Sequence, residues 1–98
     1  MTKEAASWFL KAAEKGNENA QFHLGEIYAD GRGVVQDYVQ AYKWLNISSL
    51  NGSNNATRSK KSLLEKMNQQ QISEAQEDVR KWMLKKNNSS STNWTKAN

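Results

Sequence analysis

The feature that most limits how this chain can fold is a spacing that occurs twice. The stretch AASWFLKAAEKGNENA near the start and the stretch AYKWLNISSLNGSNNA near the middle share residues at a constant offset of 36 positions. The shared pairs are Ala5 and Ala41, Trp8 and Trp44, Gly16 and Gly52, Asn19 and Asn55, and Ala20 and Ala56. A fixed period of this length is typical of solenoids, in which each helical unit covers the apolar face of its neighbour. The repeat therefore predicts stacked units, with Trp8 and Trp44 in equivalent surroundings.

Composition favours helix over sheet. The 98 residues fit one small domain and include no proline and no cysteine. Many of them are Ala, Lys, Glu, Gln and Leu, whose side chains lose little rotamer freedom in a helix. We expect an all-α protein of about five helices. The absence of cysteine excludes a disulfide framework, a thiolate metal site and a cysteine nucleophile, and it leaves the redox compartment undetermined.

The segment between the two copies shows how one unit begins. Ala20, Leu24, Ile27 and Tyr28 are spaced as one apolar stripe of a helix. Asn17 precedes this stripe and is a suitable N-cap, because its side chain can accept a hydrogen bond from a free backbone N–H. The pattern predicts the first helix of a hairpin.

Glycines and a second cap complete the unit. Gly25 inside a helix costs about 1 kcal/mol relative to Ala, so we expect the facing helix to approach it too closely for a side chain. Gly31 can end the helix in the left-handed conformation, and Gly33 permits the return turn. Asp37, with Gln40 three residues later, predicts a start for the second helix that resembles a capping box. The apolar side of that helix holds Tyr38, Ala41, Tyr42, Trp44, Leu45 and Ser48.

This string closely resembles the Sel-one-like repeat, a relative of the tetratricopeptide repeat. The matching positions are Ala20, Leu24, Gly25, Tyr28, Gly31, Gly33, Val34, Asp37, Tyr38, Ala41 and Trp44. The resemblance implies a right-handed α-α superhelix, a tetratricopeptide-like solenoid, over residues 1–86. Within it, residues 3–19 resemble the second helix of a preceding repeat, residues 20–56 a full repeat, and residues 57–86 the altered C-terminal end of an array.

The last part of the chain departs from the regular pattern. Lys60 stands at the position that matches Leu24, and Leu63, Leu64 and Met67 carry the apolar stripe instead. A further helix is expected after Asn68, with Ile72, Ala75, Val79, Trp82 and Met83 on one face and Gln71 at the reciprocal capping position. These helices are interpreted as a cap on the stack. Residues 87–98 are polar and aperiodic, which predicts a flexible tail in which Trp94 is incidental.

The N-terminal edge lacks a neighbour. Trp8, Leu10 and Ala12 belong to a predicted helix whose hairpin partner is absent from this sequence. Two interpretations stay open, that Met1 begins a fragment of a longer array or that the face pairs with another copy of the chain. We favour the fragment, because repeat arrays normally need three or more units.

No reactive constellation is visible in the sequence. His23 is the only histidine, and a single imidazole without cysteine predicts neither a zinc site nor histidine-based catalysis. Glu74, Glu77 and Asp78 lie beside Arg80 and Lys81, a pattern typical of an exposed, ion-paired helical face. We therefore expect no enzyme activity, no cofactor and no metal.

No segment predicts contact with a membrane. The sequence has no apolar run long enough to cross a bilayer, and Lys3, Glu4 and Lys11 occupy the region where a signal peptide would be apolar. We expect a soluble chain, and the sequence does not indicate its compartment.

Charge is distributed unevenly. Residues 1–56 hold five Lys or Arg and six acidic residues, a net charge of −1, whereas residues 57–98 hold nine and four, a net charge of +5. The basic side chains of the second half are Arg58, Lys60, Lys61, Lys66, Arg80, Lys81, Lys85, Lys86 and Lys96. An electrostatic binder of nucleic acid or another polyanion is the alternative function, although the interleaved aromatic residues of nucleic-acid-binding surfaces are missing.

Stacked hairpins create a concave surface, and the resemblance implies that the first helix of each pair lines it and binds a protein or peptide. By position in the pattern, the candidate binding residues are Asn19, Phe22, Glu26, Asp30, Asn55, Arg58 and Ser62. Phe22 is the expected apolar anchor, and Glu26, Asp30 and Arg58 would set the polarity of the partner. The sequence therefore predicts an interaction scaffold or adaptor.

Overall fold

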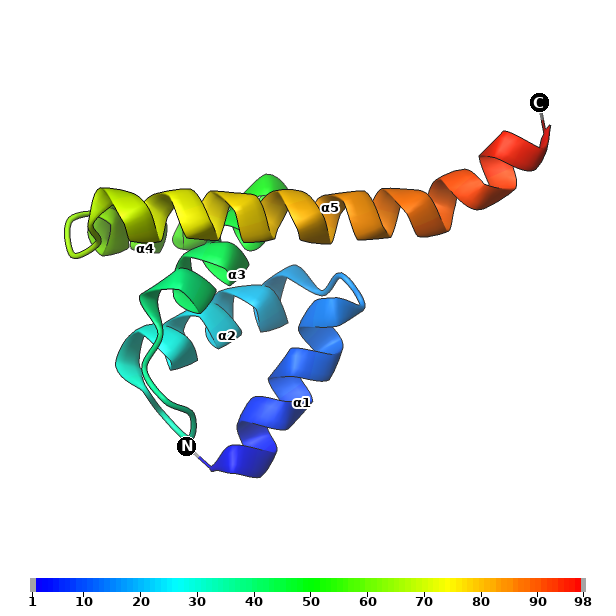
Figure 1. Cartoon of the computed structure of the whole chain (residues 1–98). Helices are drawn as coiled ribbons and strands as arrows, with labels where there is room; N and C mark the ends of the chain where they lie inside the picture. Colours follow the sequence, from blue (N-terminus) through cyan, green and yellow to red (C-terminus); the bar gives the residue numbers. More distant parts are fainter. Residues whose placement is uncertain (1, 98) are drawn as a thin grey trace.

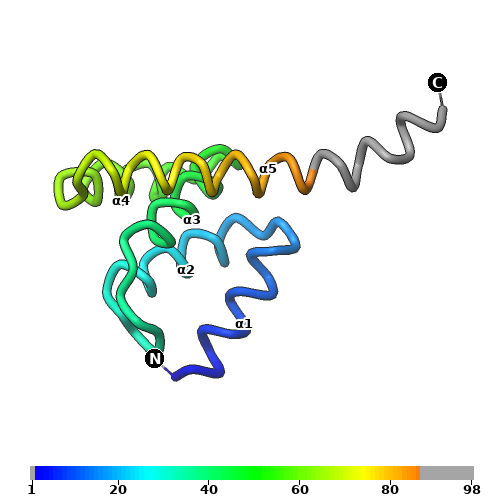
Figure 2. The backbone as a smooth tube through the Cα atoms, viewed as in Figure 1, coloured from blue at the N-terminus to red at the C-terminus, as the bar shows by residue number. Residues whose placement is uncertain are grey.

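Five α-helices follow one another along the part of the chain that the structure, a computed structural model, describes. They are α1 (Lys3–Glu14), α2 (Glu18–Asp30), α3 (Tyr38–Leu50), α4 (Asn54–Leu64) and α5 (Gln69–Ala97) (Figure 1). Residues 2–86 are described in full, and the predicted tail, residues 87–98 with Trp94, lies outside them. In Figure 2 the chain reverses direction between α1 and α2 and again between α2 and α3, and α5 lies on the same side of the molecule as α4. The all-α prediction of about five helices is confirmed.

The predicted helix ends are largely confirmed. The Asn17 side chain accepts a hydrogen bond from the Ala20 N–H at 2.9 Å, and Gly31 ends α2 in the left-handed conformation with φ of 71°. Asp37 caps α3, but its own N–H donates to the carbonyl of Tyr28 at 2.9 Å rather than to a Gln40 side chain. The turn between the two helices therefore ties the start of α3 directly to α2.

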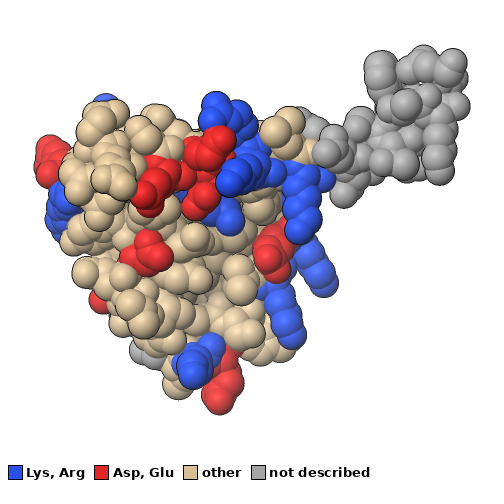
Figure 3. All heavy atoms as spheres, in the orientation of Figure 1, with Lys and Arg blue, Asp and Glu red and all other residues tan. Residues whose placement is uncertain are grey.

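The start of α5 has the complete reciprocal cap that the sequence predicts. The Asn68 N–H donates to the Gln71 side chain at 3.0 Å, and the Gln71 N–H donates to the Asn68 side chain at 2.8 Å. Along the outward side of α5, acidic and basic side chains lie close together (Figure 3), and Arg80 donates to Glu77. This is the solvated, ion-paired face that the sequence indicates.

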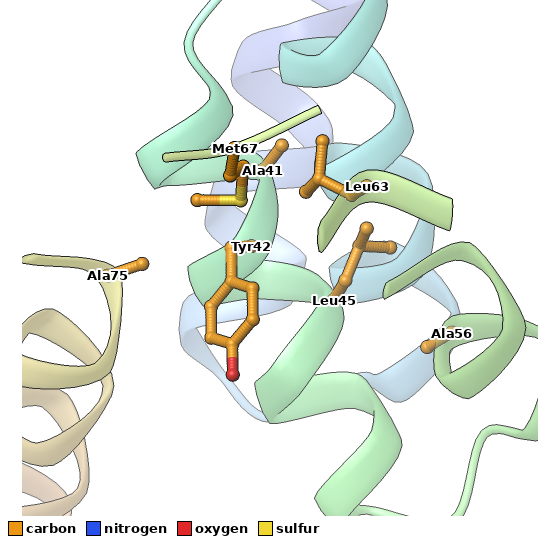
Figure 4. Close-up of a cluster of buried hydrophobic side chains, with 7 residues drawn as sticks. All are labelled: Ala41, Tyr42, Leu45, Ala56, Leu63, Met67 and Ala75. Carbon is orange, nitrogen blue, oxygen red and sulfur yellow. The ribbon is translucent and has the colours of Figure 1, made fainter. Parts of the chain in front are cut away.

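The apolar face of α5 packs against α3. Ala75 and Val79 are buried, and the Trp82 and Trp44 rings meet edge to face with centroids 5.9 Å apart. Met83, which the periodicity places on the same face, is 36% exposed and lies at the margin of the contact. Figure 4 shows Ala75 directed from α5 toward the side chains of α3. The cluster around it contains Ala41, Tyr42, Leu45, Ala56, Leu63, Met67 and Ala75.

Gly25 marks the closest approach of α2 to α3. A Cβ atom at this position would lie 2.6 Å from Leu45 Cγ and 3.2 Å from the carbonyl oxygen of Ala41. Both distances are shorter than ordinary van der Waals contact, so only glycine allows the two helices to pack at this separation. The expected packing glycine is confirmed.

Lys60 shows how the fold accommodates a charge at a position that holds leucine in the preceding unit. Its Nζ donates to the Asn46 side chain at 2.8 Å and lies 6.0 Å from the centroid of the Tyr42 ring. Lys60 is half-buried, so its aliphatic carbons pack over α3 while its ammonium group hydrogen-bonds to a polar side chain.

The expectation that Trp8 and Trp44 share equivalent surroundings is wrong. Trp44 is 2% exposed in a cluster with Leu24 and Val79, whereas Trp8 is 76% exposed. The reason is the neighbour of each helix. α3 packs against α2, α4 and α5. The equivalent side of α1, which corresponds to the side of α3 that α2 covers, has no helix against it within residues 2–86. An identical spacing in the sequence thus meets two different environments.

Candidate functional site

A cleft opens between the first helices of successive units, α2 and α4, and we call it the α2–α4 groove. It has a volume of about 260 Å³. Its lining residues are Glu26, Ala29 and Asp30 of α2, Leu45 of α3, Ser59, Ser62 and Leu63 of α4, and Lys66 just after α4. The groove therefore lies where the stacking of hairpins predicts a binding surface.

Helical periodicity explains why these side chains meet. Glu26 and Asp30 are four residues apart on α2, so they lie on one face of that helix. Ser62 is in the last turn of α4, and Lys66 lies in the turn that follows, where its N–H donates to the Leu63 carbonyl at 2.9 Å. The Ser59 hydroxyl donates to the Glu26 carboxylate at 2.6 Å, which joins the two helices across the groove. This bond fixes the separation of the two walls.

The two walls carry opposite charge. Glu26 and Asp30 place two carboxylates on the α2 side, and Lys66 places an ammonium on the opposite side. Asp30 also pairs with Arg32 at 3.2 Å on the exposed rim. Between the walls the base is apolar, since Leu45 and Leu63 are buried members of the cluster shown in Figure 4. The groove can therefore accept an apolar side chain flanked by charged groups.

The structure brings three of the predicted binding residues together. Glu26, Asp30 and Ser62 line the groove, while the other four predicted residues do not. Asn19 lies exposed near the start of α2, and Arg58 donates to Asn55 along α4.

Phe22 is held differently from a free anchor. It is half-buried, packs against the main apolar cluster, and has its ring centroid 5.3 Å from that of His23. Phe9 of α1 contacts the same imidazole, with centroids 5.4 Å apart. His23 therefore links α1 and α2 through aromatic contacts, and within residues 2–86 no acidic or hydroxyl side chain hydrogen-bonds to it as a catalytic base would require.

Two polar groove residues, Ser59 and Lys66, are absent from the predicted binding set. Lys66 stands 36 positions after Asp30, so the repeat register carried one step beyond Ser62 finds it. Ser59 stands 36 positions after His23, which is not a predicted binding residue, so the register does not find it.

A second cleft lies at the other end of the molecule, where α5 passes the end of α1. It has a volume of about 330 Å³ and is lined by Glu14, Trp82, Lys85 and Lys86. Lys86 Nζ lies 5.2 Å from the centroid of the Trp82 ring. Two of the basic residues of the second half of the chain, Lys85 and Lys86, thus line the same cleft as the Trp82 ring.

Lys43 lies beside this second cleft and is half-buried on α3. Its Nζ is 4.8 Å from the centroid of its neighbour Trp44. Burial lowers the pKa of this lysine, while the carboxylates of Asp78 and Glu14 act in the opposite direction. Lys85 acts in the same direction as burial, so the pKa of Lys43 stays below that of an ordinary lysine.

The described residues show no arrangement typical of catalysis. Within residues 2–86, no group of three or more His, Asp or Glu side chains could hold a metal ion. Glu77 is exposed, and the hydrogen bond from Arg80 lowers the pKa of its carboxyl, as expected for a surface ion pair. None of the described helical segments has the length and apolar character needed to cross a membrane.

Comparison with known families matches residues 2–17 and 19–53 to the Sel1 repeat. The chain belongs to the Sel1 repeat family. This is the family that the spacing of Leu24, Gly25, Gly31 and Trp44 indicates, and its members are helical-repeat scaffolds that are generally not catalytic. The predicted division into residues 3–19, 20–56 and 57–86 stays a prediction.

Two relatives show how much of each chain the similarity covers. An exopolysaccharide production negative regulator from Rhizobium leguminosarum bv. viciae is 44% identical over 41 residues, which are 42% of this chain and 15% of that protein. The crystal structure of c5321, a protective antigen present in uropathogenic Escherichia coli strains and displaying an SLR fold, matches with a TM-score of 0.80. It is 37% identical, and the match covers 85% of this chain and 18% of that one. The chain thus spans less than a fifth of either relative.

Proposed function

We propose that this Sel1 repeat chain is a non-catalytic interaction scaffold that binds a peptide or protein segment in the α2–α4 groove. The observation that carries the proposal is the shared lining of that groove. Glu26 and Asp30 from one repeat unit face Ser62 and Lys66 from the next across an apolar base. Neither unit alone has both walls, so the site depends on stacking.

The charges of the walls specify the segment that fits. A basic side chain of the partner would meet Glu26 and Asp30, and an acidic side chain or a C-terminal carboxylate would meet Lys66. An aliphatic side chain between them would rest on Leu45 and Leu63. The proposed ligand is therefore a short segment with a basic, an apolar and an acidic group in succession.

The test places a photo-crosslinking amino acid at Ser62, inside the groove. The matched control carries the same amino acid at Lys61, an exposed neighbour on α4 that does not line the groove. We expect a partner protein to crosslink at position 62 and not at position 61. Equal crosslinking at both positions would count against the groove.

Charge reversal gives the second arm of the test. Lys66→Glu and Asp30→Lys each remove one complementary wall, and we expect each to weaken binding of the crosslinked partner about tenfold or more, since like charges then face each other. Lys61→Glu is the control with the same charge change. Circular dichroism checks that the helices are retained, because all three side chains are exposed.

A polyanion is the second candidate partner, and the cleft of Trp82, Lys85 and Lys86 is the observation that favours it. Lys60, by contrast, is engaged with Asn46. Binding of this kind would weaken steeply with added salt and would be lost in Lys85→Glu/Lys86→Glu. An affinity that is independent of salt would eliminate this candidate.

A further inference from the structure

The outer side of α1 carries an exposed tryptophan, Trp8. Glu4, Ser7, Trp8 and Lys11 line a shallow hollow of about 210 Å³, and we call these four residues the α1 face. They follow the i, i+3, i+4, i+7 spacing of one helical stripe. Trp8 at its centre is 76% exposed. A large exposed aromatic ring framed by polar groups is typical of an interaction surface.

The charges on the α1 face are arranged symmetrically. Glu4 lies at one end of the stripe and Lys11 at the other, with Ser7 and Trp8 between them. When two identical helices pack antiparallel about a two-fold axis between Ser7 and Trp8, residue 4 of one lies opposite residue 11 of the other. Each Glu4 then faces a Lys11, and each Trp8 faces a Ser7. The face is therefore complementary to itself in charge.

We propose that the α1 face binds the α1 face of a second copy of this chain, in an antiparallel two-fold pair. The parallel arrangement is disfavoured, because it would set Glu4 against Glu4 and Lys11 against Lys11. Of the two interpretations that the sequence leaves open for the N-terminal edge, the proposal takes the second, pairing with another copy of the chain. It concerns a surface other than the α2–α4 groove and does not depend on the groove binding a partner.

A neighbouring cleft gives the Trp8 side chain of the second copy a place to rest. It has a volume of about 190 Å³, and Ser7 lines both this cleft and the α1 face. Its other lining residues are Lys3, Ala6, Leu10, Leu24, Tyr28 and Val34, which are mostly apolar. Because antiparallel pairing places Trp8 opposite Ser7, the indole of one copy lies at the mouth of this cleft in the other. Burial of two indoles supplies the main driving force.

The size of the contact sets the expected strength. From Glu4 to Lys11 the stripe spans about 10 Å of helix, or two turns. A contact of this size falls below the total buried area of about 1,200 Å² at which stable specific interfaces begin. We therefore expect a weak dimer that forms reversibly at concentrations of tens to hundreds of micromolar.

The test is sedimentation equilibrium of the full chain over a concentration series. We expect Glu4→Lys and Lys11→Glu to weaken dimerisation about tenfold each, since both ion pairs become repulsions, and Trp8→Ala to abolish it. Glu65→Lys and Lys61→Glu on the exposed surface near the end of α4 are the matched controls and should dimerise like the parent chain.

A double variant that restores the opposite charges across the interface distinguishes loss of the interface contacts from loss of helix stability. The double variant Glu4→Lys/Lys11→Glu recreates both attractive pairs in the dimer, although both changes oppose the dipole of α1. We expect it to dimerise within about threefold of the parent chain. An equimolar mixture of the two single variants should likewise form a mixed dimer.

Three results would overturn the proposal. They are a chain that is monomeric at millimolar concentration, a dimer that persists in Trp8→Ala, and a double variant weaker than either single one. Circular dichroism of each variant verifies that the fold is intact, as expected for exposed positions.

Discussion

Replacing Gly25 by alanine tests the helix contact on which the groove depends. The Cβ of an alanine would lie 2.6 Å from Leu45 Cγ and 2.7 Å from Leu45 Cδ2, about 1 Å inside the separation of roughly 3.5–4.0 Å at which carbon atoms pack. Leu45 is 1% exposed and cannot turn toward solvent, and the third close atom, the Ala41 oxygen, belongs to the backbone of α3. The clash is relieved only by moving α2 away from α3.

Two opposing effects decide the size of the change. Alanine is favoured over glycine by about 1 kcal/mol in a helix interior. Overpacking of a tight core contact costs about 1–3 kcal/mol, and the absence of a free direction at Leu45 places this case at about 2–3 kcal/mol. We expect Gly25→Ala to lower the free energy of unfolding by about 1–2 kcal/mol, which corresponds to a fall in Tm of about 4–16 °C for a domain of this size.

The assay is urea and thermal unfolding followed by circular dichroism, in a double-mutant cycle with Leu45→Ala. Leu45→Ala alone should cost about 2–5 kcal/mol, because it removes a fully buried side chain. In that background the two contacts below 3 Å are removed and only the Ala41 oxygen at 3.2 Å stays close, so the helix preference of alanine outweighs the remaining strain. Gly25→Ala should then stabilise the protein by up to about 1 kcal/mol. Stabilisation by Gly25→Ala in the parent chain, or the same sign in both backgrounds, would refute the steric argument.

Two further predictions concern a buried amide and a phenol. Gln21 is fully buried, donates to the Ala13 carbonyl at 3.0 Å and accepts from the Asn51 side chain at 2.9 Å. In urea unfolding, Gln21→Ala should therefore lower the free energy of unfolding by about 1–3 kcal/mol. Asn51→Ala should lower it less, because Asn51 is exposed. Burial, and secondarily the Asp37 carboxylate, raise the pKa of Tyr28 above its ordinary value of 10.0. The folded state therefore holds this proton more tightly, so its contribution to stability is complete below pH 10 and is lost as pH rises through the folded pKa. The stability difference between the parent chain and Tyr28→Phe should change above pH 10, and a difference that is flat to pH 11 would contradict the shift.

Much of the fold was predictable because its signals are local. The side chains of Asn17 and Asn68 each accept a hydrogen bond from a backbone N–H only three residues later. The sequence therefore reveals the starts of these two helices directly. Gly31 adopts the left-handed conformation that other residues avoid. Position in the repeat pattern likewise predicts that Glu26 and Ser62 face the groove, and both line it.

The repeat by itself determined that helical hairpins stack and that residues 36 apart occupy equivalent positions on their helices. The tertiary structure decided what each equivalent position meets, because exposure depends on which neighbour lies alongside rather than on the residue itself. Trp8 and Trp44 share one register, yet α2 covers only the second. The groove likewise arises only when α4 docks beside α2, which brings Lys66 and Asp30 to the lining of one cleft, an arrangement across units that depends on tertiary packing.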